Sequence, residues 1–248
     1  MKSILIIILS IVLHFGMMGV SQATLFTFFG EDLGSLDADS ALPNAEAAQS
    51  DFLSNLMSAG TEDFESIAAL SINPPLDFGV DTATLNGFGV IIDAFPSANQ
   101  GSFPTSGTQF LSTTPRDFVN NNFRIDFSSP QAAFGFYGTD IGDFEGQLLL
   151  SLTNGTMTDI AIPHTINAST PTSAMYFGLI VTEGSELFSS VTFDTNTQSN
   201  FFGIDDMSIA RLDQVRDIGS APIPEPSTLI LLGSGLVGLY GFRKKYKK

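Results

Sequence analysis

The chain has no cysteine and no tryptophan among its 248 residues. Without cysteine there can be no disulfide, no thiolate site for zinc or an iron–sulfur cluster, and no cysteine nucleophile. Without tryptophan there is no strong platform for stacking sugars, so tyrosine or phenylalanine would have to serve. Stability must therefore come from an apolar core, for which 23 phenylalanines supply the bulk.

Positive charge is scarce between the two ends of the chain. Residues 24–220 hold 25 of the 26 acidic residues but no lysine and only four arginines, a net charge of −21. Such a body repels phosphate backbones, which excludes nucleic acid as an expected partner. Acidity of this kind suits solubility outside the cell and attracts cations.

Signals for catalysis are also few. His164 is the one histidine of the body, and we expect it on a surface loop. No Gly-x-Ser-x-Gly elbow and no glycine-rich phosphate loop accompany it. A glycosidase needs only two carboxylates, roughly 5–10 Å apart. With so many acidic residues, the sequence leaves that alternative open.

The N-terminus predicts an export signal over residues 1–23. Lys2 supplies a positive charge, Ile4 to Leu13 is almost unbroken aliphatic sequence, and Ser21-Gln22-Ala23 ends the segment with small residues. This order is typical of a secretory signal peptide cleaved after Ala23. A retained N-terminal anchor is the alternative.

The C-terminal residues 224–248 have three unlike parts in a fixed order. Pro224-Glu225-Pro226 comes first, then an uncharged apolar stretch (227–242), then a basic tail (243–248) that includes Arg243, Lys244 and Lys245. At ~1.5 Å rise per residue the apolar stretch is a transmembrane helix of roughly 24 Å, short of the ~30 Å hydrocarbon core. The basic tail should stay cytoplasmic, so that the body lies outside.

These three parts resemble the PEP-CTERM sorting signal of Gram-negative bacteria that make exopolysaccharide. The resemblance covers about a tenth of the chain. It implies anchoring in the inner membrane, recognition of Pro224-Glu225-Pro226 by an exosortase-type enzyme, and removal of the tail during sorting. The protein would then reach the cell surface or the extracellular matrix. An ordinary tail anchor without a sorting enzyme is the alternative.

One helix is predicted in the N-terminal segment 24–60 of the body, at about residues 42–58. Asp39 or Ser40 can cap it, and Gly60 can end it. Apolar residues recur there at spacings of three and four, so one face of the helix is apolar. A polar loop is expected from Glu31 to Ser40.

Residues 61–210 change to short alternating runs separated by glycine, proline, asparagine and serine. In residues 122–127, for example, three apolar residues share one face while Arg124 and Asp126 share the other. Similar runs are the following: 133–137, 147–153, 157–162, 174–181, 190–194 and 201–210. This pattern predicts an all-β fold, an antiparallel jelly-roll-like β-sandwich, followed by a linker at 211–223.

Two acidic motifs stand near opposite ends of this β region. The first contains Glu62 and Glu65, and the second is Ile204-Asp205-Asp206-Met207. In the second motif two apolar residues are three apart, which breaks the alternation and predicts a β-bulge. A bulge would aim a carboxylate out of the sheet.

These motifs resemble those of the jelly-roll carbohydrate-binding modules. The resemblance implies a structural calcium with Glu65 and Asp205 as ligands and Asp206 or Glu62 as helpers. Backbone carbonyls or water would have to complete its 6–8 oxygen ligands. Two solvated acidic strand ends are the alternative.

A third acidic cluster lies between glycines after a strand. It contains Asp140, Asp143 and Glu145, and could hold a second cation or contact sugar hydroxyls. A solvated turn is the alternative for this loop.

The sequence as a whole predicts an exported, non-catalytic protein of the cell surface or exopolysaccharide matrix, either glycan-binding or structural. Its segments "FLSNLMSAGTEDFES", "FGFYGTDIGDFEGQ" and "FFGIDDMSI" resemble the bodies often attached to this sorting signal. The alternative function is a glycoside hydrolase or lyase that acts on exopolysaccharide through a pair of carboxylates.

Overall fold

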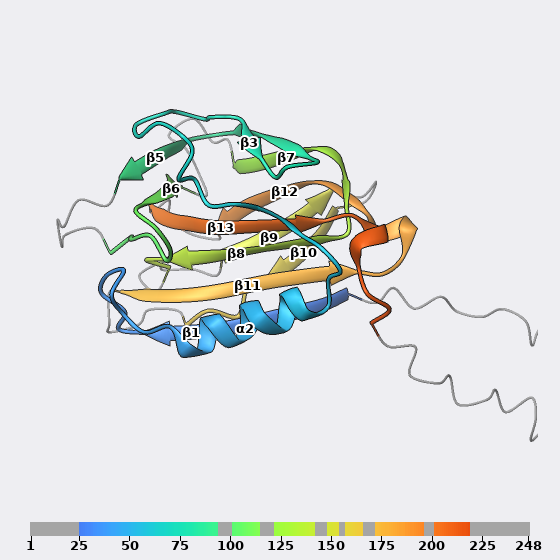
Figure 1. The fold of residues 1–248 in the computed structure, drawn as a ribbon, viewed down its shortest axis with the longest axis horizontal. Helices are drawn as coiled ribbons and strands as arrows, with labels where there is room; N and C mark the ends of the chain where they lie inside the picture. The colour runs from blue at the N-terminus through green and yellow to red at the C-terminus, as the bar shows by residue number, and fades with distance from the viewer. Residues whose placement is uncertain are drawn as a thin grey trace, which may run out of the picture. The chain divides into compact units, whose positions relative to one another are not determined.

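The computed structural model describes residues 25–93, 101–114, 122–141, 148–153, 157–165, 172–195 and 201–218. These residues form two antiparallel sheets and one α-helix (Figure 1). The first sheet has seven strands in the order β1-β11-β8-β13-β6-β5, with β2 also paired to β13. Its strands are β1 (Leu25–Leu33), β2 (Gly60–Glu62), β5 (Gly89–Asp93), β6 (Gln109–Thr113), β8 (Ala133–Thr139), β11 (Ser173–Val181) and β13 (Phe202–Ala210).

The second sheet has six strands in the order β10-β9-β12-β7-β4-β3. Its strands are β3 (Leu76–Asp77), β4 (Thr82–Asn86), β7 (Phe123–Gln131), β9 (Leu148–Thr153), β10 (Met157–Ala161) and β12 (Phe188–Thr195). Two short 3₁₀ turns, η1 (Gly184–Glu186) and η2 (Leu212–Gln214), complete the described elements. From β7 onward the chain crosses repeatedly between the two sheets, so the predicted jelly-roll-like β-sandwich is confirmed.

Phenylalanines fill the space between the sheets. Phe134 and Phe136 of β8 lie against Phe193 of β12, with ring centroids 6.3 and 5.2 Å apart. All three side chains are fully buried, and both ring pairs are edge-to-face, a favoured aromatic geometry. These rings point inward because side chains alternate between the two faces of a strand. The aromatic bulk of the core therefore comes from phenylalanine, since the chain has no tryptophan.

The sandwich begins earlier than the sequence indicates. The segment 25–33 forms the strand β1 and pairs with β11 over its whole length, from Leu25 opposite Val181 to Leu33 opposite Ser173. Glu31 is therefore part of a strand and not the start of the expected polar loop, and the first sheet extends beyond the range 61–210. The run Leu-Phe-Thr-Phe-Phe hides this strand, because it lacks a clean apolar/polar alternation.

Helix α2 (Pro43–Ser54) lies on the outer face of the seven-stranded sheet, across β1 and β11 (Figure 1). Phe52 anchors the helix, because its ring occupies space that Gly135 and Gly178 leave open. A Cβ atom on Gly178 would lie 2.6 Å from Cδ2 of Phe52. Glycine in these two strands thus permits close approach of the helix.

The helix is shorter than the predicted range 42–58, and its cap comes from elsewhere in the chain. Its first backbone N–H groups are satisfied by Asp32 of β1, whose Oδ2 accepts from the N–H of Ala45 at 2.9 Å and from that of Asn44 at 3.2 Å. The expected cap Ser40 instead accepts from Leu36 N at 3.0 Å. Capping by a residue of a neighbouring strand cannot be read from local sequence.

Candidate functional site

The predicted bulge in β13 is present at Asp205-Asp206. The register with β8 shifts between Asp205 and Ser208, and Asp206 has a φ of 45°. This left-handed conformation is uncommon for a residue with a side chain. The two neighbouring carboxylates consequently leave the regular pleat of the strand.

Asp205 is a buried loop anchor, with 1% of its surface exposed. Its Oδ2 accepts from the N–H groups of Thr105 at 2.7 Å and Ser106 at 3.0 Å. Burial and, to a smaller degree, the charge of Asp206 outweigh the hydrogen bonds from Ser106, Thr105 and Asp206, so the pKa of Asp205 is raised to about 7. Asp205 therefore holds the loop before β6.

The same loop is held at two further points. Oδ1 of Asp206 accepts from Oγ of Ser106 at 3.0 Å. Oε1 of Glu65 accepts from the N–H groups of Thr108 and Gln109, both at 2.7 Å. Burial raises the pKa of Asp206, with a smaller contribution from Asp63 and Glu65, so these carboxylates lie within each other's field. For Glu65, hydrogen bonds from Thr108 and Gln109 outweigh the effect of slight burial and leave the pKa lowered.

The carboxylate of Glu62 accepts hydrogen bonds from nearby backbone N–H groups. Glu62 is 4% exposed, and its two oxygens accept from the N–H groups of Phe64 and Asp77, both at 2.9 Å. The structure thus places all four residues of the predicted calcium set near the bulge in the middle of β13, but each carboxylate accepts protein N–H or O–H groups. Among the described residues, no three His, Cys, Asp or Glu side chains form a metal-holding group. Calcium stays a prediction.

The third predicted cluster is described only in part. Asp140 is buried, has a φ of 64°, and lies against Gly101, where a Cβ atom would meet its carboxylate. Asp143 and Glu145 lie outside the described residues. Asp140 is therefore a residue of a tight, packed turn.

His164 is not the surface residue that we expected. Its side chain is 4% exposed, and burial lowers its pKa. It follows β10 in a segment that Glu31 of β1 holds by accepting from the N–H of Thr165 at 3.1 Å. The burial of His164 could not be predicted from Pro163-His164 alone, because the segment is held by a residue that is distant in the sequence.

A continuous row of polar side chains crosses the outer face of the six-stranded sheet. The strand registers place the following residues side by side on five neighbouring strands: Asp159, Ser151, Thr192, Arg124 and Asn86. A second row beside it contains Ser190, Asp126 and Thr84. We call these eight residues the polar face. Leu152, Val191 and Ile125, which alternate with these residues along the three central strands, point into the core.

Hydrogen bonds hold the side chains of the polar face in place. Oγ of Ser151 donates to Asp159 at 2.6 Å. Asp126 accepts from both Arg124, at 2.9 Å, and Asn86. The exposed fractions of Arg124 and Asp126 are 49% and 34%, so these two side chains remain open to solvent, whereas Ser151 and Ser190 are buried. The local sequence pattern places Arg124 and Asp126 on one strand face, but the row itself depends on cross-strand register, which local patterns do not give.

Residues 222–245 match the family described as the PEP-CTERM protein-sorting motif. The chain carries a PEP-CTERM sorting signal. This signal implies export and recognition by an exosortase. The predicted signal peptide with Ala23, the Pro224-Glu225-Pro226 motif and the apolar stretch 227–242 lie outside the described residues. No helix within the described ranges is long and apolar enough to span a membrane.

The solved structures that resemble the body are distant. The K2 cleaved adhesin domain of Lys-gingipain is 13% identical, with a TM-score of 0.38 over 62% of this chain and 98% of that domain. A Stig cyclase from Fischerella sp. TAU is 10% identical, with a TM-score of 0.35 over 62% and 99%. A family 22 carbohydrate-binding module of Clostridium thermocellum Xyn10B is 14% identical, with a TM-score of 0.33 over 66% and 97%. Likenesses this distant carry no argument about a ligand, and no curated protein matches the sequence.

Proposed function

We propose that this exported protein binds a neutral polysaccharide of the extracellular matrix, without catalysis, through the polar face. The observation that carries the proposal is the unbroken row from Asp159 to Asn86 across five strands. At ~4.8 Å between strands the row is roughly 19 Å long, which suits a chain ligand better than a single sugar ring. Hydroxyl, amide, carboxylate and guanidinium groups together offer the donors and acceptors that sugar hydroxyls require.

Charge favours a neutral chain over an acidic one. The body carries −21, and Arg124 already donates to Asp126, so a polyanion would find no free cation on the polar face. None of the eight residues is aromatic, so binding would rest on hydrogen bonds of ~1 kcal/mol each. Each site would be weak, and many copies on one polysaccharide would give the avidity that a matrix needs.

The non-catalytic part of the proposal rests on the state of the carboxylates. Glu62 and Asp205, the most buried of the predicted set, have their oxygens directed at loop N–H groups. A general acid or nucleophile must instead be able to reach the substrate.

A pull-down with exopolysaccharide from the producing organism tests this proposal. The full chain in detergent is compared with a variant carrying Thr84→Ala and Asn86→Ala, and with a control carrying Ser50→Ala and Ser66→Ala at exposed positions elsewhere. Loss of two hydrogen-bonding side chains should weaken retention about tenfold. Equal retention of all three proteins would contradict the assignment to the polar face. Shortening of the polysaccharide over hours would favour the hydrolase or lyase.

Sorting is tested separately in the producing cell. We propose that an exosortase-type enzyme of the inner membrane acts at Pro224-Glu225-Pro226 and that the processed body reaches the surface or matrix. Replacing Pro224 and Pro226 by alanine should leave a full-length, membrane-retained chain on immunoblots of cell fractions. Normal release of this variant would contradict the proposed role of the motif.

A further inference from the structure

The two strand orders end at four edge strands in the described part of the chain, and three of these are short or covered. Strand β2, which pairs only with β13, has just three residues. Beside β5, the N–H of Leu70 donates to the carbonyl of Ile91 and the N–H of Ile91 donates to Ser71, at 2.8 and 3.0 Å. Strand β3 has only two residues, and β10 has five, with Asp159 among them. Short, charged or covered edges resist pairing with other chains.

The fourth edge, strand β1, differs from the other three. It has nine residues in unbroken register with β11, and it contains no proline, lysine or arginine. Among the described residues, its free side is contacted by side-chain hydrogen bonds only near one end. There, Nδ2 of Asn44 donates to the carbonyl of Glu31 at 3.1 Å, and Thr165 donates to the Glu31 carboxylate. The stretch Leu25–Gly30 is left as an apolar, regular edge.

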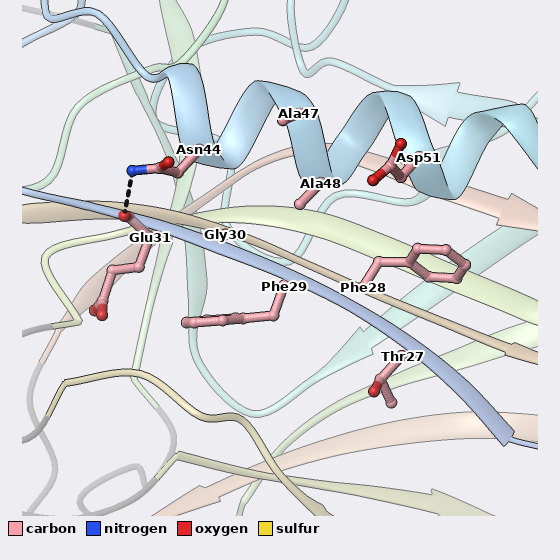
Figure 2. Close-up of a pocket in the computed structure, with 9 residues that line it drawn as sticks. All are labelled: Thr27, Phe28, Phe29, Gly30, Glu31, Asn44, Ala47, Ala48 and Asp51. Carbon is pink, nitrogen blue, oxygen red and sulfur yellow. Dashed lines mark hydrogen bonds between the residues drawn. The ribbon is translucent and has the colours of Figure 1, made fainter.

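A groove follows this open edge. It has a volume of about 630 Å³ and lies between β1, from Thr27 to Glu31, and the side of α2 that carries Asn44, Ala47 and Asp51. Figure 2 shows Phe28 on the helix side of β1 and Phe29 on the other side, so the groove includes the strand edge itself. The small side chain of Ala47 leaves room for a further backbone beside the strand.

We propose that an extended, positively charged polypeptide segment from a partner protein pairs with the free edge of β1 in this groove. In an antiparallel sheet, alternate residues of an edge strand direct both N–H and C=O outward, and only another backbone satisfies them in series. Side chains of the added strand would lie alternately toward α2 and toward the opposite side of the sheet.

Charge complementarity identifies the partner as cationic. The groove is lined by two charged side chains, Glu31 and Asp51, both acidic, and no described arginine lines it. Hydrogen bonds to Asp51 within the described residues go to its backbone carbonyl, which leaves its carboxylate for a ligand. A second copy of this chain would bring another Glu31 and another body of −21, so like charges oppose self-pairing.

A synthetic peptide tests the proposal directly. The probe is a fluorescent octapeptide of alternating lysine and valine, and its counterpart has glutamate in place of lysine. Binding to the full chain in detergent is followed by fluorescence anisotropy, and hydrogen exchange locates the peptide. We expect saturable binding of the lysine peptide, at least tenfold tighter than the glutamate peptide. Alternate amides between Leu25 and Gly30 should exchange more slowly when the lysine peptide is bound.

Variants test whether the lysine peptide binds in the groove or to any acidic surface of the protein. Asp51→Asn should weaken binding of the lysine peptide about fivefold, while Asp213→Asn, the same charge change at an exposed position of η2, should not. Ala47→Trp, at an exposed helix position, should fill the groove and abolish binding. Equal affinity for both peptides, protection outside β1, or concentration-dependent dimerisation with protection of β1 would each overturn the proposal. Polysaccharide retention should stay unchanged in all three variants, so this test and that of the polar face fail independently.

Discussion

The outer faces of the two sheets follow opposite rules. On the seven-stranded sheet, β8 and β11 are buried along their whole length, because α2 covers the face that the core does not. On the six-stranded sheet, β4 and β7 alternate between buried and exposed residues, and the outer residues are polar. Within one sandwich, a helix therefore packs on the outer face of one sheet, while the outer face of the other sheet carries polar side chains.

Truncation of Phe52, which anchors α2, should lower the free energy of unfolding more than any other change considered below. Phe52→Ala would leave a cavity between α2 and the seven-stranded sheet, where Phe52 contacts Phe28 and Tyr176. We expect the free energy of unfolding to fall by about 4 kcal/mol, measured by urea denaturation. Asn86→Ala on the polar face should lower it by less than about 0.5 kcal/mol. Similar losses for the two variants would remove the distinction between the faces.

Closing the space under the helix should have the next largest effect. A methyl group in Gly178→Ala would lie 2.6 Å from one ring atom of Phe52 and 2.9 Å from another. Overpacking of this kind should cost about 3 kcal/mol. In a Phe52→Ala background the same substitution should cost much less, which a double-mutant cycle would measure. Additive losses would show that the helix does not limit this position.

The two sheets are also joined by an ion pair whose loss should be smaller. Asp81, which precedes β4, accepts from Nε and Nη2 of Arg211, which follows β13, both at 2.7 Å. Asp81→Asn should cost about 2 kcal/mol, because it weakens two charged hydrogen bonds.

The pH dependence of this pair has a defined sign. Hydrogen bonds from Arg211 lower the pKa of Asp81 to about 2, below its unfolded value. Its stabilisation is therefore present above pH ~4 and is lost as the pH falls toward 2. Acid titration of the melting temperature should show this loss in the native chain but not in Asp81→Asn. A parallel loss in both proteins would assign it to other groups.

The buried acid beneath the loop before β6 should respond to pH in the opposite direction. Burial raises the pKa of Asp205 to about 7, so the folded chain binds a proton that the unfolded chain releases between pH ~4 and 7. Stability should rise as the pH falls through this window, by at most ~1.4 kcal/mol per pH unit from this group. Asp205→Asn should remove that component of the slope. An unchanged slope would mean that other residues cause it.

Calcium makes the smallest expected difference. If Glu65 and Asp205 hold the ion as the sequence predicts, millimolar calcium should stabilise the chain by ~1 kcal/mol, as for a weak extracellular site. The melting temperature should rise with calcium and fall back with chelator, and Asp206→Asn should reduce the rise. Indifference to both additions would leave these carboxylates as loop anchors alone.

Local patterns predicted the strands from Phe123 onward and the bulge at Asp205-Asp206, because alternation and its interruption are written within a few residues. They did not predict β1, the cap from Asp32 or the burial of His164, since each depends on a partner distant in sequence. The polar face shows the same limit: Arg124 and Asp126 were recognised on their strand, but the register that joins them to Asp159 was not. The sorting signal could be predicted without the fold, because its residues are contiguous in the sequence.

The position of β1 has a consequence for the order of events during export. Its partners in β11 lie 140 to 156 residues further along the chain, and its own first residue is the second after Ala23. If the predicted signal peptide leads the chain across the membrane, the most phenylalanine-rich strand emerges first and must wait for most of the body before it can pair. Throughout this interval the chain presents an unpaired apolar segment next to the predicted cleavage position after Ala23, so it is most exposed to wrong partners before the sheet exists.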